Sequence, residues 1–350
     1  MGLKVRNETD EIDTEIVIET PMENLDLYEG DTILTEKQVD EMVDELVKQA
    51  DEKKIDVSNI EDKSRKKRGK RSIYSSKNNM WTFPIPYYVE TGVDATLVTT
   101  ALNFIESETC VRFTKSATPI TGKPGLRRIY TDAPQEISIG SGCGQKGILQ
   151  HETAHALGVY HEQSRPDRYL YVSIKTENII AGKESNFAGS IPGFAFSKNG
   201  NQTIVALDRK FDKTMGQRNM LSFNDVKLIN YKYCNSTCPS TSISCRNGGY
   251  ENPNSCGVCR CPLGFYGTNC QNYVGSKSTL CGNQFLTANT TLQTLNVTGA
   301  IECYYYISTP MYQVRLNVIS TNLVNNDPCY TGKGLEIKYQ NDRSALIHIK

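Results

Sequence analysis

The sequence lacks three features that would indicate a class of protein directly: a net charge, a visible secretory signal and a membrane-spanning segment. Its formal net charge is zero, so the overall charge favours neither nucleic acid nor an anionic membrane surface as a partner. The first 15 residues contain no apolar run with a basic flank, so no secretory signal is visible there. No segment is apolar for long enough to span a bilayer. We therefore expect neither a nucleic-acid partner nor a membrane span.

What the sequence has in quantity is cysteine. Twelve of its 350 residues are cysteine, and eight of these lie within residues 234–281, where apolar residues are scarce. Disulfides stabilise small extracellular modules that cannot build a large core. Five Asn-x-Ser/Thr triplets agree with a secretory route; they begin at Asn7, Asn201, Asn235, Asn289 and Asn296. We expect a secreted, extracellular protein of two to four domains.

Charge is distributed unevenly near the start of the chain. Residues 1–62 carry 20 acidic side chains against 6 basic ones, whereas residues 63–71 carry seven basic side chains. A flexible, exposed basic strip of this kind suits a processing protease. A nuclear-localisation signal is the alternative, which the cysteines and the triplets disfavour. The pattern predicts an acidic propeptide over residues 1–71, cleaved after Arg71.

The remainder divides by pattern into three parts. Residues 72–234 mix strand-like runs with helical patterns, which predicts an α+β domain. The strand-like runs cover residues 85–89 and 126–130, and the helical patterns cover residues 95–107 and 147–157. Residues 238–270 form a small cysteine-rich module. Beyond Cys281, alternating apolar residues at 300–307 and 313–319 predict an antiparallel β-domain.

The most informative stretch runs from residue 151 to residue 161. In a helix, residues four apart share a face, so His151 and His155 can bind one cation with Glu152 beside them. Gly158 can take a left-handed conformation, end the helix and let His161 approach from another direction. Three nitrogen ligands with one open position are typical of a catalytic zinc site rather than a structural one.

This site predicts peptide hydrolysis. Zinc lowers the pKa of water toward roughly 7, and Glu152 can accept the proton and return it to the leaving amine. The alternative is a helix that carries two unrelated histidines. The chain has only four histidines, however, and three of them lie in these eleven residues.

The extended motif His-Glu-x-x-His-x-x-Gly-x-x-His and its continuation Glu-Gln-Ser-Arg-Pro-Asp-Arg (162–168) resemble the astacin family of metzincins. Further matches lie at Trp81, Pro86-Tyr87, 108–113, 216–218 and Leu221-Ser222. The resemblance implies a two-lobed α+β metzincin catalytic domain over residues 72–234, with a zinc helix under a mixed sheet. It also implies one catalytic zinc ion, and proteins or peptides as substrates.

The resemblance assigns roles to individual residues. It implies three zinc ligands, namely His151, His155 and His161, with Glu152 as the general base. Glu162 would contact the amino terminus that cleavage after Arg71 releases. Asp31 ends the sequence Tyr-Glu-Gly-Asp, which resembles the aromatic-x-Gly-Asp motif whose aspartate keeps such proteases latent. Asp31 is therefore the expected zymogen latch.

The cysteines also resemble the family's pattern. The resemblance implies a bond between Cys110 and Cys234, and an EGF-like module at 235–271 with the pairs Cys238–Cys256, Cys245–Cys259 and Cys261–Cys270. A zinc ribbon is the alternative, but two separated Cys-x-x-Cys pairs are absent. Cys281, Cys303 and the following stretch resemble the first part of a CUB domain at 281–350, a truncated β-sandwich, and we expect these two cysteines to form a disulfide. A generic β-sandwich fragment is the alternative there.

Two departures from the family pattern affect the expected activity. Between residues 186 and 196 the Met-containing turn and the tyrosine that follows it are missing. Residues 130–134 replace a longer stretch that carries a cysteine in the family, so Cys143 has no evident partner, and Cys329 would need one beyond Lys350. Besides a secreted zinc endopeptidase, the sequence therefore allows a weakened or inactive relative that acts as an extracellular binding protein.

Overall fold

The computed structural model describes most of the chain from Met80 onward and one short strand near the start. The described ranges are 3–7, 80–120, 135–139, 144–162, 165, 167–181, 197–239, 243–299, 301–310, 313–323, 328–329, 331–332, 334–345 and 347–349. Asp31, Arg71, Cys143 and the segment 182–196 lie outside these ranges.

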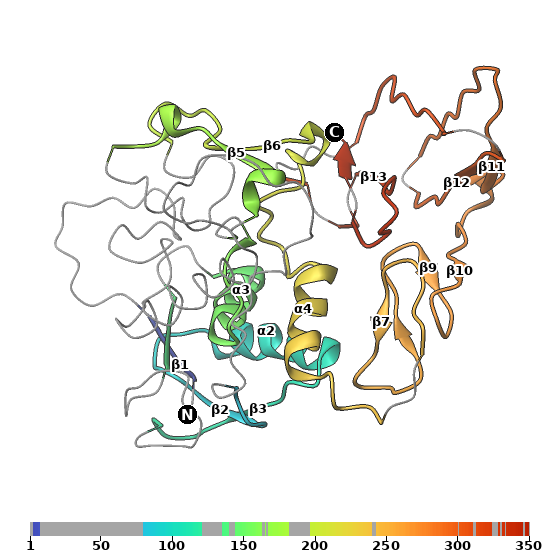
Figure 1. The fold of residues 1–350 in the computed structure, drawn as a ribbon. Helices are drawn as coiled ribbons and strands as arrows, with labels where there is room; N and C mark the ends of the chain where they lie inside the picture. Colours follow the sequence, from blue (N-terminus) through green and yellow to red (C-terminus); the bar gives the residue numbers. More distant parts are fainter. Residues whose placement is uncertain are drawn as a thin grey trace, which may run out of the picture.

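The first part of the described chain contains both α-helices and strands, and short strands follow (Figure 1). The helices are α2 (Ala95–Glu108), α3 (Lys146–Ala156) and α4 (Phe223–Tyr233), with short 3-10 helices η3 (Arg168–Leu170), η4 (Thr176–Asn178), η6 (Arg209–Phe211) and η7 (Thr279–Cys281). The strands up to α4 are β1 (Leu3–Asn7), β2 (Ile85–Val89), β3 (Phe113–Lys115), β4 (Gln135–Ile139), β5 (Val172–Ile174) and β6 (Ile204–Ala206). Those after α4 are β7 (Tyr250–Glu251), β8 (Cys259–Arg260), β9 (Phe265–Tyr266), β10 (Asn272–Tyr273), β11 (Phe285–Thr287), β12 (Tyr306–Ser308), β13 (Leu335–Ile337) and β14 (Ile347–Ile349). None of the helices described is both long and apolar enough to cross a membrane.

The main sheet has the strand order β3-β2-β1-β4, and all its described pairs are parallel. We expected a mixed sheet, so the described part differs from that expectation. The β2-α2-β3 unit shows the reason, because the helical crossover returns the chain to the end of the sheet at which β2 began, so that β3 runs parallel to β2. The outer strand β4 pairs with β1, which comes from the very start of the chain.

The helices begin and pack as their sequences dictate. Asp94 caps α2, because its Oδ1 accepts hydrogen bonds from the backbone N–H groups of Thr96 (2.8 Å) and Leu97 (3.0 Å). Ser222 and Asp225 form a capping box at the start of α4. The buried side chains of α2 recur at three- and four-residue steps and face the core; they are Val98, Ala101, Leu102 and Ile105.

One hydrophobic core joins the sheet to the three α-helices of the described residues. It contains Trp81, Ile85, Ile105, Leu149 and Ile229, among other buried side chains. The zinc-motif helix α3 therefore lies against the sheet and the other two helices rather than at the periphery of the domain. A second, smaller cluster forms around β5 and β6.

Within the described residues, ten cysteines form five disulfides. Cys110–Cys234 joins the end of α2 to the end of α4 across a sequence separation of 124 residues. The other four are Cys238–Cys256, Cys245–Cys259, Cys261–Cys270 and Cys281–Cys303. The first four pairs are those that the family resemblance implies, and the fifth joins Cys281 and Cys303, which were also expected to form a disulfide.

The part after residue 281 is less regular than the alternation of its sequence predicts. Strands β11 and β12 pair in parallel and β13 pairs with β14 in antiparallel fashion, whereas residues 313–319 form no strand. The expectation of an antiparallel β-domain was therefore wrong for the pair β11–β12 and for residues 313–319. In residues 313–319 large apolar side chains are exposed, Leu316 and Ile319 among them. An alternating sequence is not enough to form a stable strand when no second layer covers its apolar face.

Replacing Cys110 and Cys234 by serine should lower the free energy of unfolding by about 2–5 kcal/mol, because the disulfide restricts a long loop of the unfolded chain. Trp81 is the single tryptophan and is buried in this core, so its fluorescence during urea unfolding reports the change. The matched control replaces Cys261 and Cys270, which are 9 residues apart. A Trp81 transition that shifts as much in the control would contradict the assignment.

Candidate metal centre

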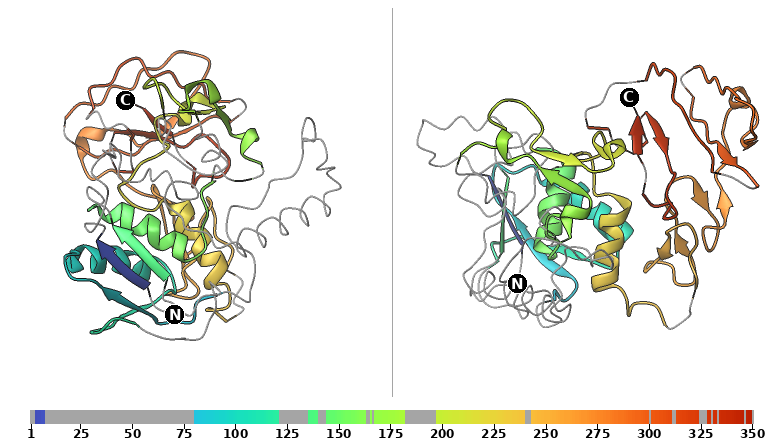
Figure 2. Two further views of the ribbon diagram at one scale, coloured as in Figure 1. Left: turned by 90° about the vertical axis from the view of Figure 1, so that its left-hand side faces the viewer. Right: turned by 45° about the horizontal axis from the view of Figure 1, so that its top comes forward.

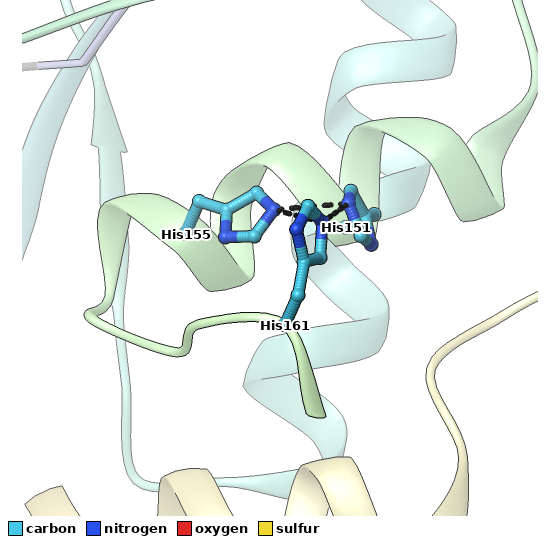
Figure 3. Close-up of side chains that lie close together, drawn as sticks. All are labelled: His151, His155 and His161. Atoms are coloured by element: carbon cyan, nitrogen blue, oxygen red, sulfur yellow. Dashed lines mark hydrogen bonds between the residues drawn. The ribbon is translucent and has the colours of Figure 1, made fainter. Parts of the chain in front are cut away.

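Three histidines converge on one point beside α3 (Figure 3). His151 and His155 lie on the helix, and His161 reaches the same point from the loop that follows it. The Nε2 atoms are 2.9 Å apart for His151 and His155, 3.0 Å for His155 and His161, and 2.9 Å for His161 and His151. His161 is buried, and the other two side chains are half-buried.

The turn after α3 brings His161 into place. Gly158 has a φ of 94°, a left-handed conformation that favours glycine. Its N–H donates to the carbonyl of His155 (2.8 Å), and the N–H of Val159 donates to the carbonyl of Ala154 (3.0 Å). This pair of hydrogen bonds is the Schellman arrangement, which ends a helix and reverses the chain direction.

Two side chains from distant parts of the chain complete the end of α3. The indole N–H of Trp81 donates to the carbonyl of Ala156 (2.7 Å), and the hydroxyl of Tyr233 donates to the carbonyl of Leu157 (2.7 Å). Both hydrogen bonds are buried. The last carbonyls of a helix have no partner within the helix, so these two donors stabilise the end from which the loop to His161 departs.

The hydrogen bonds assign the protons of His155. Its Nδ1 lies 2.7 Å from the backbone carbonyl of Val159. Because a carbonyl oxygen only accepts, Nδ1 carries the hydrogen, and Nε2 of the neutral ring then carries the lone pair. A lone pair aimed at the centre of the cluster is what a metal ligand needs, and a backbone carbonyl behind the ring is a common outer partner of such ligands.

The cluster fits a cation better than a hydrogen-bonded trio. Three ring nitrogens in mutual contact cannot all be satisfied by each other, because at least one pair must place hydrogen against hydrogen or lone pair against lone pair. A cation accepts all three lone pairs. Nitrogens about 2.0–2.1 Å from a tetrahedral zinc are about 3.3 Å apart, so the observed spacing needs to open by only a few tenths of an ångström.

Glu152 follows His151 on α3 and is half-buried. The start of the helix is fixed by close packing against the residues before α4. A side chain at Gly147 would place Cβ 2.1 Å from the carbonyl oxygen of Arg218, so only glycine fits there. The buried Gln150 accepts a hydrogen bond from the N–H of Leu221 (3.1 Å). These contacts leave Glu152 and the histidines little freedom to shift.

Glu162 lies directly after the cluster and contacts Arg165. The guanidinium of Arg165 donates to Glu162 (2.9 Å) and, through two nitrogens, to Asp167 (2.8 and 2.7 Å). Burial opposes the charge of Arg165, but the hydrogen bonds to Asp167 and Glu162 outweigh it and raise the pKa of the guanidinium above its ordinary value. Arg165 therefore stays charged and holds the Glu162 carboxylate beside the cluster.

Three contributors to this site were not assigned roles from the sequence. Trp81 and Tyr233 cap the zinc-motif helix, and Arg165 binds Glu162. A local sequence pattern cannot predict that a side chain will cap a helix end that is 75 or 76 residues away in the sequence. The only signal was the resemblance itself, which includes Trp81 and Arg165 without a role.

The fold and the cluster define a protein with a three-histidine metal site of the metallopeptidase class. Residues 73–193 and 191–234 match the family model described as Astacin, a peptidase family. The chain belongs to the astacin family, and zinc is the metal that this family uses. The break between the two matched segments coincides with the stretch in which the Met-containing turn is missing.

Relatives from nematodes share this similarity. The chain is 38% identical to zinc metalloproteinase nas-34 of Caenorhabditis elegans, over 99% of this chain and 62% of that protein. It is 33% identical to nas-30 of the same organism, over 90% of this chain and 44% of that protein. It therefore spans about half of the length of such relatives.

Among solved structures, the chain is similar to high choriolytic enzyme 1, a hatching enzyme zinc-protease from the medaka fish Oryzias latipes. The sequence identity is 29% and the TM-score is 0.38, and the match covers 45% of this chain and 94% of that one.

Replacing His151, His155 or His161 by alanine should lower zinc affinity by more than the roughly 10–100-fold that loss of an outer partner costs, because each change removes a ligand. Zinc per chain after dialysis, measured by atomic spectrometry, tests this expectation. The fourth histidine, His348 in β14, provides the matched control. Equal zinc loss in His348→Ala, or full zinc content in any of the other three variants, would contradict the site.

Tyr233→Phe should lower the free energy of unfolding by about 1–3 kcal/mol, because it leaves the buried carbonyl of Leu157 without its donor. Urea unfolding followed by circular dichroism measures the change. Tyr231→Phe, on the exposed side of the same helix, is the control and should change stability by less than about 0.5 kcal/mol. Similar losses in the two variants would show that the hydroxyl of Tyr233 has no special role.

Proposed function

We propose that this chain is a secreted zinc endopeptidase that is made as a zymogen and hydrolyses peptide bonds of extracellular proteins. The observation that carries the proposal is the geometry of the cluster. Three Nε2 atoms lie within 3.0 Å of one another, the lone pair of His155 points at their centre, and Glu152 stands beside His151 on the same helix.

The residues of the chain divide the chemistry between them. His151, His155 and His161 would hold zinc, which when bound supplies a Lewis acid that polarises the substrate carbonyl and acidifies water. The carboxylate of Glu152 removes a proton from the attacking water. The same carboxylate then gives that proton to the leaving amine nitrogen as the peptide C–N bond breaks.

Latency is a further part of the proposal. Residues 1–71 act as the propeptide, Asp31 is the latch, and a processing protease cuts after Arg71. Arg165 supports this proposal, because it holds Glu162 in the uncut chain. After cleavage, the new amino terminus at Ser72 would compete for the same carboxylate, as the family resemblance implies.

The trailing modules are proposed to be an EGF-like module at 235–271 and a partial CUB-like domain at 281–350. The disulfide pairs of residues 238–270 support the first, and Cys281–Cys303 supports the second. Four sequons have exposed asparagines in the described residues, which supports glycosylation and a secretory route; they are Asn201, Asn235, Asn289 and Asn296.

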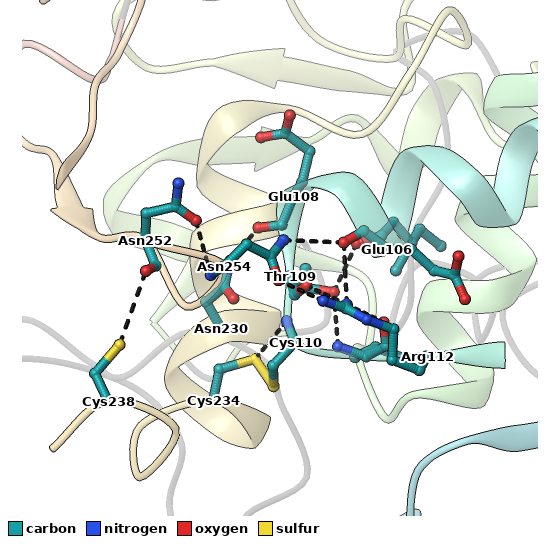
Figure 4. Close-up of a disulfide and its surroundings, with 12 residues drawn as sticks. Glu106, Glu108, Thr109, Cys110, Arg112, Asn230, Cys234, Cys238, Asn252 and Asn254 are labelled. Carbon is teal, nitrogen blue, oxygen red and sulfur yellow. Dashed lines mark hydrogen bonds between the residues drawn. A yellow bond between two sulfur atoms is a disulfide. The ribbon is translucent and has the colours of Figure 1, made fainter. Parts of the chain in front are cut away.

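The cysteine-rich module packs on the catalytic domain beside the Cys110–Cys234 disulfide (Figure 4). The side-chain amide of Asn254 donates to the carbonyls of Glu106 (3.0 Å) and Ser107 (3.1 Å) at the end of α2. It also accepts a hydrogen bond from Arg112 (2.5 Å), and Arg260 pairs with Glu108. The module thus caps the exposed end of α2, which supports a fixed rather than a loosely tethered position.

A catalytically inactive binding protein is the second candidate. One observation favours it, namely the missing Met-containing turn and its tyrosine between residues 186 and 196. Loss of an oxyanion stabiliser costs about 10²–10³ in kcat. In this case the chain would act through its trailing modules.

Activity of the chain cut at Arg71 should fall by about 10²–10⁴ in Glu152→Gln, because the substitution keeps the shape but removes the general base. A quenched peptide substrate measures the activity, and zinc content should stay unchanged. Glu177→Ala, an exposed carboxylate in η4, is the control and should keep full activity. Zinc-loaded wild-type chain without activity would contradict the peptidase and leave the binding protein as the remaining candidate.

A further inference from the structure

The first strand of the chain occupies an interior position in the main sheet. In β1, Leu3, Lys4 and Val5 pair with residues 87–89 of β2, and the whole strand pairs with residues 135–139 of β4. In two views the blue strand lies among the strands of the catalytic domain (Figure 2). Within the described residues, β1 is the only strand that pairs with β4. The start of the chain is therefore built into the domain that cleavage at Arg71 would separate from it.

The register matches the sequence pattern of β1. Leu3 stands opposite Tyr87, and Val5 stands opposite Ile137. Tyr87 and Ile137 are both buried in the main core. Directly paired residues of neighbouring strands share a face of the sheet. In the sequence, the apolar residues Leu3 and Val5 alternate with the basic residues Lys4 and Arg6, so the apolar ones occupy the register positions of the buried neighbours.

The strand next to β1 leads to the metal centre. Ile137 and Ile139 of β4 belong to the same buried cluster as Leu149 of α3. Without β1, the facing edges of β2 and β4 would each expose a row of backbone N–H and C=O groups. The domain would then contain a slot one strand wide beside the helix that carries the histidines. Such a slot accepts an extended peptide that completes both edges.

We propose that residues 3–7 are a permanent strand of the catalytic domain and that the N-terminal segment stays bound after the chain is cut at Arg71. The occupant of the slot between β2 and β4 is the chain's own first strand, held by backbone hydrogen bonds on both sides. The processed protein is then a noncovalent complex of two fragments. Cleavage changes the covalent connection, but the sheet keeps the four strands described here.

The test cuts the full chain at Arg71 with a protease specific for multibasic sites. The products are separated by size-exclusion chromatography in native buffer that contains a metal chelator. The chelator removes zinc and with it any attachment through Asp31. A fragment that still co-elutes with the remainder is then held by the pairing of β1. We expect the fragment that begins at Met1 to co-elute with the remainder and to separate only in denaturant. Separation in native buffer would overturn the proposal.

A matched pair of variants tests the strand itself. Val5 pairs with both Val89 and Ile137, and proline at an interior strand position cannot donate a ladder hydrogen bond. Val5→Pro should release the fragment after cutting, whereas Val5→Thr, which keeps the N–H and the branched side chain, should retain it. Retention in Val5→Pro equal to that of the wild type would contradict the proposal.

Amide hydrogen exchange in the uncut wild-type chain decides the matter even if Val5→Pro does not fold. The amides of residues 3–7 should exchange as slowly as those of β2 and β4, because all three strands open together. Fast exchange at residues 3–7 beside slow exchange at residues 135–139 would overturn the proposal. Neither readout depends on peptidase activity, so a failure here is distinguishable from a failure of the proposed function.

Discussion

The site depends on one hydrogen bond, between Nδ1 of His155 and the carbonyl of Val159. This bond places the hydrogen on one side of the ring and the lone pair on the other. It exists because the left-handed Gly158 turns the chain back under the helix. The same turn sends the chain on to His161. One residue conformation thus determines both the chemical state of the second histidine and the position of the third.

The rest of the domain holds that turn in place. Trp81, which lies shortly before β2, and Tyr233, from α4, donate to the last two carbonyls of the helix region. The Cys110–Cys234 disulfide fixes the residue directly after Tyr233. On the opposite side, β4 packs against α3 and is itself paired with β1. The metal centre is therefore anchored by segments from both ends of the catalytic region.

The C-terminal segments add contacts to the same framework. The hydroxyl of Tyr339 bonds to Asp208, and the ring lies 5.2 Å from the ammonium of Lys210. Ser344 donates to Asn224 in the first turn of α4 (3.0 Å). These contacts are exposed or half-buried, so each stabilises little alone. Together with those of Asn254 they join residues after Cys234 to the part of the chain that carries the histidines.

Local patterns in the sequence predicted the local structure well. The helical pattern at 95–107 became α2, the pattern at 147–157 became α3, and the strand at 85–89 was confirmed to the residue. The three histidines could be predicted to come together because their spacing places two of them on one face of a helix and the third directly after the turn that ends it. This part of the site needed no knowledge of the tertiary fold.

Long-range structure could not be predicted in the same way. Nothing near Leu3 in the sequence indicates that it pairs with residues far away in two other strands. Segments 300–307 and 313–319 alternate like strands, but of their described residues only Tyr306 and Ile307 fall in one. A period of two says which residues can share a face, whereas pairing requires a partner edge, which the sequence does not name.

X-ray absorption at the zinc edge, on the zinc-loaded chain, tests the central claim most directly. The account predicts three imidazole nitrogens at about 2.0–2.1 Å and one further light atom. In His161→Ala the number of imidazole ligands should fall from three to two. Sulfur scattering at about 2.3 Å would mean that cysteines hold the zinc, and either that result or fewer than three imidazoles in the wild-type chain would contradict the account.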